Sequence, residues 1–169
     1  MAIRRVLESY QYGHAPPAPA RGRITARQLS QEQTAGATRQ LLQLSLGAVQ
    51  LHLGLQRPPG PGPFPVIVHI DHRGVFHEPL PEETAGRGYV IASYDPTVIA
   101  PDTPGSVGPA QAAYPDRDWA TLAIWAWGAS RVVDYLITLP WIVVVPDSAA
   151  GVPAAAKVGR SWRATHERV

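Results

Sequence analysis

The sequence contains no cysteine, one methionine and two phenylalanines among its 169 residues. Without cysteine the chain can form no disulfide and has no thiolate nucleophile, and its redox compartment stays open. Charged residues make up only 17% of the chain and hydrophobic residues 45%, which is typical of a folded protein rather than a disordered one. The formal net charge of +2 falls short of the clustered positive charge that nucleic-acid binding needs.

Long hydrophobic segments are also missing from the sequence. The longest apolar run, residues 136–145, is interrupted by Pro140 and is far below the ~20 residues that span a bilayer. Residues 1–19 have no apolar core of a signal peptide, so the cytoplasm is the default expectation. No zinc-type ligand spacing occurs, and three neighbouring histidines are expected to be solvated or hydrogen-bonded: His69, His72 and His77.

The length of the chain fits one domain with a sizeable core. Residues 1–30, rich in arginine, alanine and proline, are predicted to form an extended arm with one short helical turn around Val6 and Leu7. Three prolines exclude regular structure there, because proline fixes φ and lacks an N–H: Pro16, Pro17 and Pro19. Residues 31–169 are predicted to form the folded domain.

Alternating apolar and polar residues predict an antiparallel β-hairpin within residues 38–58. The apolar positions on either side of Gly47-Ala48 are Leu42, Leu44, Leu46, Val49, Leu51, Leu53 and Leu55. A period of two is typical of strands with one buried face. The proline- and glycine-rich residues 57–65 are predicted to form a connection, because they suit neither a helix nor a central strand.

Strands and helices alternate in the next part of the chain. Residues 65–71 and 87–95 are apolar runs typical of strands covered on both faces, with a short helix predicted at residues 81–85. Residues 97–114 are predicted to form a long loop, which in a compact domain is usually functional or mobile. This order implies a parallel sheet with right-handed crossovers and an antiparallel hairpin at one edge.

The clearest helix is predicted over residues 118–138, with Asp118 as its N-cap. Apolar residues recur at three- and four-residue steps and predict one buried stripe: Leu122, Ala126, Ala129, Val133 and Leu136. Tryptophans at positions 119, 125 and 127 are too many for that stripe, so the helix is expected to be covered on more than one side. Core packing is favoured for these rings over stacking on a ligand.

A buried strand and a sharp turn are predicted after this helix. Residues 141–145, WIVVV, are rich in β-branched side chains, and the turn that follows carries Ser148 before small residues. A strand, a tight turn with a serine and then a helix is the layout of a nucleophile elbow. Ser148 is therefore the candidate nucleophile.

Four segments of the sequence are distinctive: YGHAPPAP, GPFPVIV, GRGYVIASYDP and YPDRDWATLAIWAWGASRVVDYL. Together they resemble the glucuronoyl-esterase-like and acetyl-xylan-esterase-like carbohydrate esterases of the α/β-hydrolase superfamily. The resemblance implies a three-layer α/β sandwich. Residues 31–169 would be a partial α/β-hydrolase domain, the N-terminal half of that fold, truncated after the helix that follows the nucleophile elbow.

The resemblance also implies a chemistry. In such esterases a serine attacks a carboxylic ester, a histidine acts as base and an acidic residue orients the histidine, without a metal or an organic cofactor. Ser148 falls at the nucleophile position, and the backbone N–H of Ala149 falls where it helps to form the oxyanion hole. A carbohydrate ester is the implied substrate, and neither a nucleic acid nor a membrane is an expected partner.

The turn departs from the family pattern G-x-S-R-x-G-K at three places. Pro146 replaces the first glycine, Ala149 the arginine and Val152 the lysine, while Gly151 keeps the last glycine. Pro146 restricts the strained backbone that an elbow needs. Loss of the arginine removes a positive charge near the developing oxyanion.

The rest of the catalytic triad is not found. His166, beside Glu167, is the sole histidine after Ser148, and adjacent residues do not readily align base and orienter. The chain alone is therefore expected to be truncated and inactive, and the alternative is a non-catalytic remnant or a partner-binding α/β module. Residues 141–145 would then form an exposed sheet edge through which the chain could self-associate.

Overall fold

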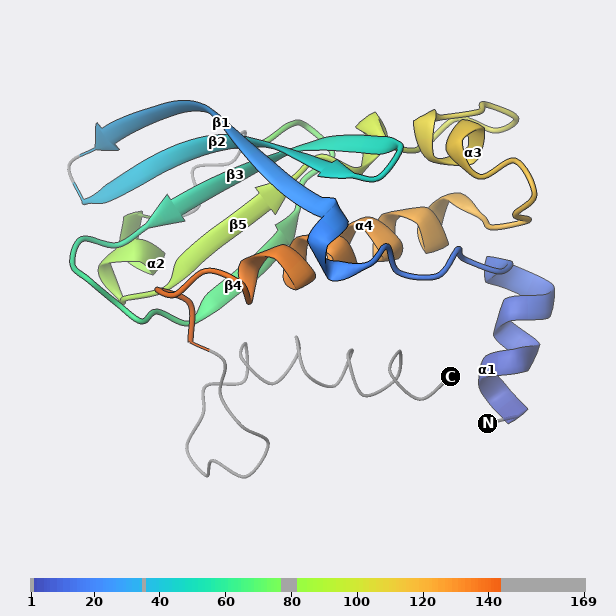
Figure 1. The fold of residues 1–169 in the computed structure, drawn as a ribbon, viewed down its shortest axis with the longest axis horizontal. Helices are drawn as coiled ribbons and strands as arrows, with labels where there is room; N and C mark the ends of the chain where they lie inside the picture. Colours follow the sequence, from blue (N-terminus) through green and yellow to red (C-terminus); the bar gives the residue numbers. More distant parts are fainter. Residues whose placement is uncertain (1, 35, 77–81, 144–169) are drawn as a thin grey trace.

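The computed structural model describes residues 2–34, 36–76 and 82–143. It has a mixed α/β architecture built on a five-stranded sheet with the strand order β1-β2-β3-β5-β4 (Figure 1). The strands are β1 (Ile24–Thr34), β2 (Ala37–Leu46), β3 (Val49–Arg57), β4 (Val66–Ile70) and β5 (Val90–Tyr94). The helices are α1 (Ala2–Leu7), α2 (Glu82–Gly86), α3 (Pro109–Ala113) and α4 (Thr121–Leu136), with a π-helical turn at Glu8–Tyr12 and 3-10 turns at Arg21–Arg23 and Pro96–Val98.

The predicted hairpin is confirmed, but β1 rather than the hairpin stands at the edge of the sheet. The strands predicted at residues 65–71 and 87–95 are confirmed as a parallel pair. β2 and β3 pair antiparallel, with Leu46 opposite Val49 across the turn, and Gly47 has a φ of 77° that suits glycine there. β4 and β5 pair parallel, with Val66 opposite Val90. Since β3 is antiparallel to β5, the sheet joins an antiparallel part to a parallel one.

Strand β1 differs from the sequence-based expectation. Residues 24–30 were predicted as part of an extended arm, yet they form a strand that pairs with β2. The three prolines of the arm end before this strand begins, so they do not prevent it. Residues 25–33 are exposed on both faces, and no apolar alternation marks them because neither face is buried.

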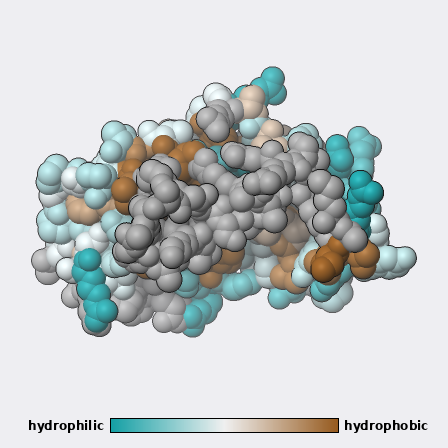
Figure 2. Space-filling model, turned by 90° about the horizontal axis from the view of Figure 1, so that it is seen from below, coloured by the Kyte–Doolittle hydropathy of each residue, from teal (hydrophilic) through white to brown (hydrophobic). Residues whose placement is uncertain are grey.

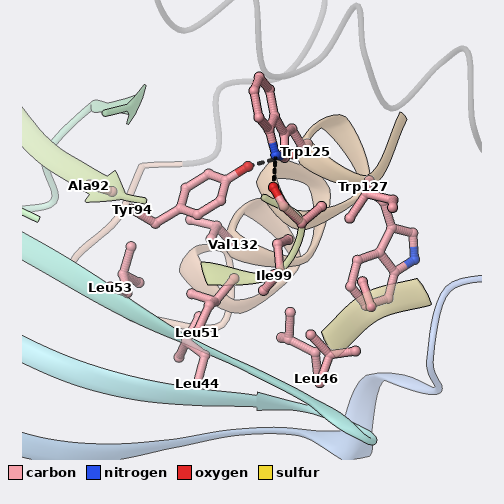
Figure 3. Packing of buried hydrophobic residues seen from close by; sticks show 14 of the residues in the cluster. Leu44, Leu46, Leu51, Leu53, Ala92, Tyr94, Ile99, Trp125, Trp127 and Val132 are labelled. Atoms are coloured by element: carbon pink, nitrogen blue, oxygen red, sulfur yellow. Dashed lines mark hydrogen bonds between the residues drawn. The ribbon is translucent and has the colours of Figure 1, made fainter. Parts of the chain in front are cut away.

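The hydrophobic core lies between the sheet and α4. Leucines of β2 and β3 point to α4, where they meet Ala92 and Tyr94 of β5 and the buried side of the helix (Figure 3). The alternating leucines predicted from the sequence therefore do lie on one buried face of the sheet. Burying each such side chain stabilises the fold by about 1.5–3 kcal/mol relative to leaving it exposed.

Helix α4 begins later than predicted and turns a different face inward. Its N-cap is Ala120, whose side chain makes no capping hydrogen bond, so the prediction of Asp118 as N-cap is wrong. Leu122 and Ala126 of the predicted stripe are exposed, and Leu122 is 55% exposed. The buried residues are Ile124, Trp125, Trp127, Gly128, Ser130, Arg131, Val132 and Leu136.

The inward face of α4 depends on tertiary fit as well as on apolar character. A Cβ at Gly128 would lie 2.7 Å from Ile99 Cδ1 and 3.2 Å from the Tyr94 hydroxyl, so glycine lets the helix approach these side chains. The prediction that the tryptophans belong to the core is confirmed, since all three are buried.

The amino-terminal arm is fastened to the start of α4. The backbone N–H and ring Nδ1 of His14 lie 2.8 and 3.0 Å from Asp118 Oδ1, and the Ala120 N–H donates to the Tyr12 carbonyl at 2.8 Å. Gly13 between them has a φ of 68°, and a Cβ there would lie 2.1 Å from the Asp118 carbonyl oxygen. Asp118 therefore holds the arm instead of capping the helix.

Strand β4 is less covered than predicted. Its first four residues are half-buried and Ile70 is exposed, whereas the apolar run predicted burial on both faces. It is the last named strand of the described sheet, so one side lacks a full neighbour there. An isolated parallel bridge joins Phe64, just before β4, to Ile142, and the Val143 N–H donates to the Phe64 carbonyl at 2.9 Å.

Figure 2 shows hydrophobic (brown) side chains at several places on the described part of the face seen there. The largest exposed ones include Ile3, Val6 and Tyr10 near the amino terminus. In the described part of the chain no helix has the length and apolar character to cross a membrane.

Candidate functional site

The carboxyl ends of β4 and β5 form the edge of the sheet at which an α/β protein usually places its site. Because the two strands are parallel, the loops that follow them start side by side. The Asp71 N–H donates to the Tyr94 carbonyl at 3.0 Å and continues the strand pairing by one residue. The pairing of β4 and β5 therefore positions the start of both loops at this edge of the sheet.

Asp71 is a buried carboxylate at this edge, only 5% exposed. Its Oδ1 accepts the Arg73 N–H at 3.0 Å and lies 3.8 Å from Arg73 Nε. These contacts give the charge of the carboxylate a nearby counter-charge and fold the loop back on itself. Asp71 therefore fixes the first turn of the loop after β4.

Asp95 has the corresponding role after β5. Its Oδ1 accepts the Thr97 N–H at 2.8 Å and the Thr97 hydroxyl at 2.5 Å, and it caps the 3-10 turn that begins at Pro96. A carboxylate used in this way orients a loop. Both acidic residues at the edge thus shape the loops that border the candidate site.

Trp125 and Tyr94, both drawn in Figure 3, form an aromatic support, and Trp125 contacts residues of the loops after β4 and β5. The Trp125 ring is buried, its Nε1 donates to the Ala100 carbonyl at 2.9 Å, and the His72 ring meets it edge-on at 4.6 Å. The Tyr94 hydroxyl donates to the Trp125 carbonyl at 2.5 Å. Burial raises the pKa of Tyr94 well above its ordinary value, so the hydroxyl stays protonated and acts as a donor.

Removing the Tyr94 hydroxyl tests this supporting role. We expect Tyr94→Phe to lower the free energy of unfolding by about 0.5–1.5 kcal/mol, the usual net contribution of one hydrogen bond. Urea denaturation followed by circular dichroism measures the change. Tyr10→Phe is the matched control, because Tyr10 is 87% exposed and its substitution should leave the stability unchanged. Equal stability of Tyr94→Phe and the wild type would contradict the prediction.

The neighbouring histidines do not form a metal site in the described part of the chain. Among the described residues no group of three or more histidine and acidic side chains is placed to hold an ion. His69 Nδ1 is buried without a hydrogen-bond partner, and His72 packs on Trp125 instead. His77 lies outside the described residues.

The predicted catalytic residues also lie outside the described residues. Ser148 and the Ala149 backbone N–H belong to this group, as do Pro146, Gly151 and His166. The description of the preceding segment ends at Val143, one residue after the bridge to Phe64. Their predicted roles stay predictions.

Sequence reasoning missed Asp71, Asp95 and the loops that they shape. A signal for both exists: each aspartate directly follows an apolar strand and is followed within two residues by a polar residue or proline. Such a signal is weak alone, because aspartate is common in turns.

Comparison with known proteins rests on structure. No protein-family model matches the sequence, and no curated protein matches it. A promiscuous CE15 esterase from a marine bacterial metagenome matches 85% of this chain with a TM-score of 0.64 and 20% identity, and the match covers 48% of that protein. A CE15 glucuronoyl esterase from Caldicellulosiruptor kristjansonii matches 84% of this chain with a TM-score of 0.55 and 20% identity, over 40% of its own length.

Acetyl xylan esterase 1 from Thermoanaerobacterium sp. JW/SL YS485 matches 84% of the chain with a TM-score of 0.50 and 13% identity, over 52% of its length. The chain thus spans about half the length of the solved structures that it matches, or less. At these identities the likeness concerns the fold. The comparisons confirm that this chain resembles CE15 glucuronoyl esterases and acetyl xylan esterase, and its described part has the fold of the matching part of those enzymes.

Proposed function

We propose that this chain forms the nucleophile-bearing part of a serine carboxylic-ester hydrolase that acts on carbohydrate esters, with Ser148 as nucleophile. The fold is the observation that carries the proposal. A parallel β4–β5 pair is bordered by the antiparallel β3, and residues 141–143 enter beside the start of β4. This arrangement matches solved carbohydrate esterases over most of the described chain.

The register at Phe64 supports the proposed position of the nucleophile. Phe64 bridges to Ile142 in parallel, and Ser148 follows Ile142 by as many residues as Ile70 follows Phe64. If the pairing continues in that register, Ser148 stands beside the end of β4. It would then face the loop that begins at Asp71.

That loop suits a second role in the same proposal. In α/β-hydrolases one oxyanion donor is the backbone N–H after the nucleophile, and the other comes from the loop after the neighbouring strand. Here the first is the Ala149 N–H, and the loop after β4 begins with Asp71 and His72. The fixed turn at Asp71 would hold such a donor in place.

The structural neighbours indicate the substrate class. Two of them are described as glucuronoyl esterases, from Caldicellulosiruptor kristjansonii and Sporotrichum thermophile, and one as an acetyl xylan esterase. A mutant of the Sporotrichum enzyme was solved in complex with methyl 4-O-methyl-β-D-glucopyranuronate. By analogy, an ester of a sugar or of a uronic acid is the proposed substrate.

The same proposal includes inactivity of these 169 residues on their own. Pro146 restricts the elbow backbone, and Ala149 lacks the positive charge of the family's arginine. His166 and Glu167 are adjacent, which does not suit a base and its orienter. The scaffold would be present and the general base would be missing.

Hydrolysis of an aryl acetate with and without added imidazole tests both parts. Without imidazole, the wild type and Ser148→Ala are expected to give equal rates near background. Imidazole can supply the missing base, and a positioned base contributes ~10²–10⁴-fold to such reactions. With imidazole the wild type should therefore exceed Ser148→Ala.

The outcomes of this experiment distinguish two claims: that Ser148 can act as a nucleophile, and that the chain is inactive by itself. Equal rates for the two proteins in imidazole would show that supplying a base alone does not make Ser148 a nucleophile in these 169 residues, and would contradict a missing base as the cause of inactivity. A wild-type rate that is well above background without imidazole, and is lost in Ser148→Ala, would show that the chain is active by itself. Circular dichroism of both proteins confirms that the comparison is between folded chains.

A further inference from the structure

The outer side of strand β1 is an open sheet edge. β1 stands at one end of the strand order, and among the described residues no strand pairs with its outer side (Figure 1). It is 11 residues long, about twice the usual strand length, and residues 25–33 are all exposed. A long edge of this kind presents unpaired N–H and C=O groups to which another strand can pair.

The edge carries one irregularity. The register between β1 and β2 shifts between Gln28 and Ser30, so Leu29 is an extra residue, as in a β-bulge. Edge strands often use a bulge or a charge to prevent pairing with foreign strands. A partner that fits this edge must therefore match both the bulge and the charges.

The bulge brings two opposite charges to the same face. Arg27 and Glu32 are an odd number of positions apart, so in a regular strand they would lie on opposite faces. Their partners on β2, Gln43 and Arg39, are an even number of positions apart and share one face. Contacts agree with this: Arg27 Nη2 donates to Gln43 Oε1 at 2.8 Å, and Arg39 Nη1 lies 3.8 Å from Glu32 Oε1.

The order of side chains along β1 fits a second copy of itself. If two copies run antiparallel about a two-fold axis between Leu29 and Ser30, they align residue for residue, because both carry the extra residue at the same place. The matched facing pairs, each formed twice, are Arg27 with Glu32, Gln28 with Gln31, and Thr25 with Thr34. In the same register Ala26 faces Gln33, and Leu29 faces Ser30 at the bulge. Opposite charges and hydrogen-bonding side chains that face each other stabilise antiparallel strands.

The glutamines of this edge are held in place before any pairing. Gln40 Nε2 donates to Gln28 Oε1 at 3.1 Å and to Gln31 Oε1 at 2.8 Å, which places both side chains on the face of the sheet opposite Arg27 and Glu32. Side chains that are already ordered lose less entropy on association.

We propose that two copies of this chain pair through their β1 edges, antiparallel, and form a two-fold dimer with one continuous sheet. In this register a second copy of the chain matches the charges, the amide side chains and the bulge of β1. This interface is separate from the proposed catalytic site, and it uses the opposite edge of the sheet from the bridge between Phe64 and Ile142. The proposal does not depend on the esterase assignment.

Charge reversal tests the proposal, with the molar mass measured by sedimentation equilibrium over a range of protein concentrations. The wild type is expected to be a dimer, and Glu32→Arg a monomer, because Arg27 then faces arginine. The double variant Arg27→Glu/Glu32→Arg restores opposite charges across the interface and is expected to restore the dimer. Arg39 is repelled equally by the new arginine in both variants, so a loss of stability within one chain would not distinguish them.

A wild type that stays monomeric, a single variant that stays dimeric, or a double variant that stays monomeric would each overturn the proposal. A disulfide provides a second measurement, since the chain has no cysteine of its own. Arg27→Cys/Glu32→Cys should form a covalent dimer on oxidation, because facing residues are within disulfide reach. Glu32→Cys alone is the matched control: in this register its two copies lie roughly 16 Å apart and should not cross-link. Equal cross-linking of both variants, or none in the double variant, would contradict the register.

Discussion

Replacing Trp127 with alanine is expected to lower the free energy of unfolding by about 3–5 kcal/mol, the usual cost of truncating a buried tryptophan. Trp127 is 5% exposed. Its ring meets those of Trp119 and Tyr114 edge-on, at 5.6 and 6.0 Å between centroids, and Arg131 Cζ lies 5.8 Å from its ring centre. The truncation leaves a cavity and removes these contacts together. Urea denaturation followed by far-ultraviolet circular dichroism measures the loss.

Leu122→Ala is the matched control for this prediction. Leu122 is on the same helix and was predicted from the sequence to be buried, but it is 55% exposed. Its truncation should change the stability by no more than about 0.5 kcal/mol. A loss at Leu122 as large as the loss at Trp127 would mean that the buried face of α4 is the one that the sequence pattern predicted.

Asp134→Ala is expected to lower the free energy of unfolding by about 3 kcal/mol. The Arg131 side chain is 7% exposed, and its Nη2 lies 2.7 Å from Asp134 Oδ2. Burial lowers the pKa of Arg131, and the charge and hydrogen bond of Asp134 oppose that shift. Removing Asp134 leaves a buried guanidinium without its counter-charge, which typically costs ~3–5 kcal/mol. We expect the lower end because Asp134 itself is 26% exposed.

A second variant separates loss of the pair from loss of one partner. Arg131→Met/Asp134→Ala removes both charges and fills part of the same space, so it should recover most of the stability that Asp134→Ala loses. The same urea denaturation gives both values. If the double variant is as unstable as the single one, an unpaired buried charge is not the cause of the loss.

The sequence predicts those elements whose residues carry a local pattern. Leu42, Leu44 and Leu46 alternate with polar residues because one face of β2 is buried, so the hairpin is visible in the sequence. Strand β1 is not visible, because its residues are exposed on both faces and its pairing depends on β2. A strand with one buried face shows alternating apolar and polar residues in its sequence, and a strand exposed on both faces does not.

Helix α4 shows a different limit. Its existence follows from apolar residues at helical spacing, but its orientation depends on Gly128, Ile99 and Tyr94, which meet only in the folded chain. A pattern of apolar residues ranks Ala126 above Arg131, although the arginine is the buried residue, because Asp134 compensates its charge. The orientation of a helix is a tertiary property.

For the candidate site, too, one residue could be predicted from the sequence and others could not. Ser148 was predicted from the order of elements that precede it and from the family pattern, and this prediction awaits the imidazole experiment. Asp71 and Asp95 were not predicted, because an aspartate after a strand has many ordinary uses. Only their hydrogen bonds to Arg73 and Thr97 show that they shape the edge of the sheet.

The fastening of the arm at His14 and Asp118 has a consequence for the order of folding. The two residues are 104 positions apart, and closing a flexible loop of that length costs about 4 kcal/mol in chain entropy. An exposed pair of this kind contributes about 0–1 kcal/mol, too little to close the loop by itself. We therefore expect the sheet and α4 to come together before the arm docks, because their packing brings Asp118 within reach of His14.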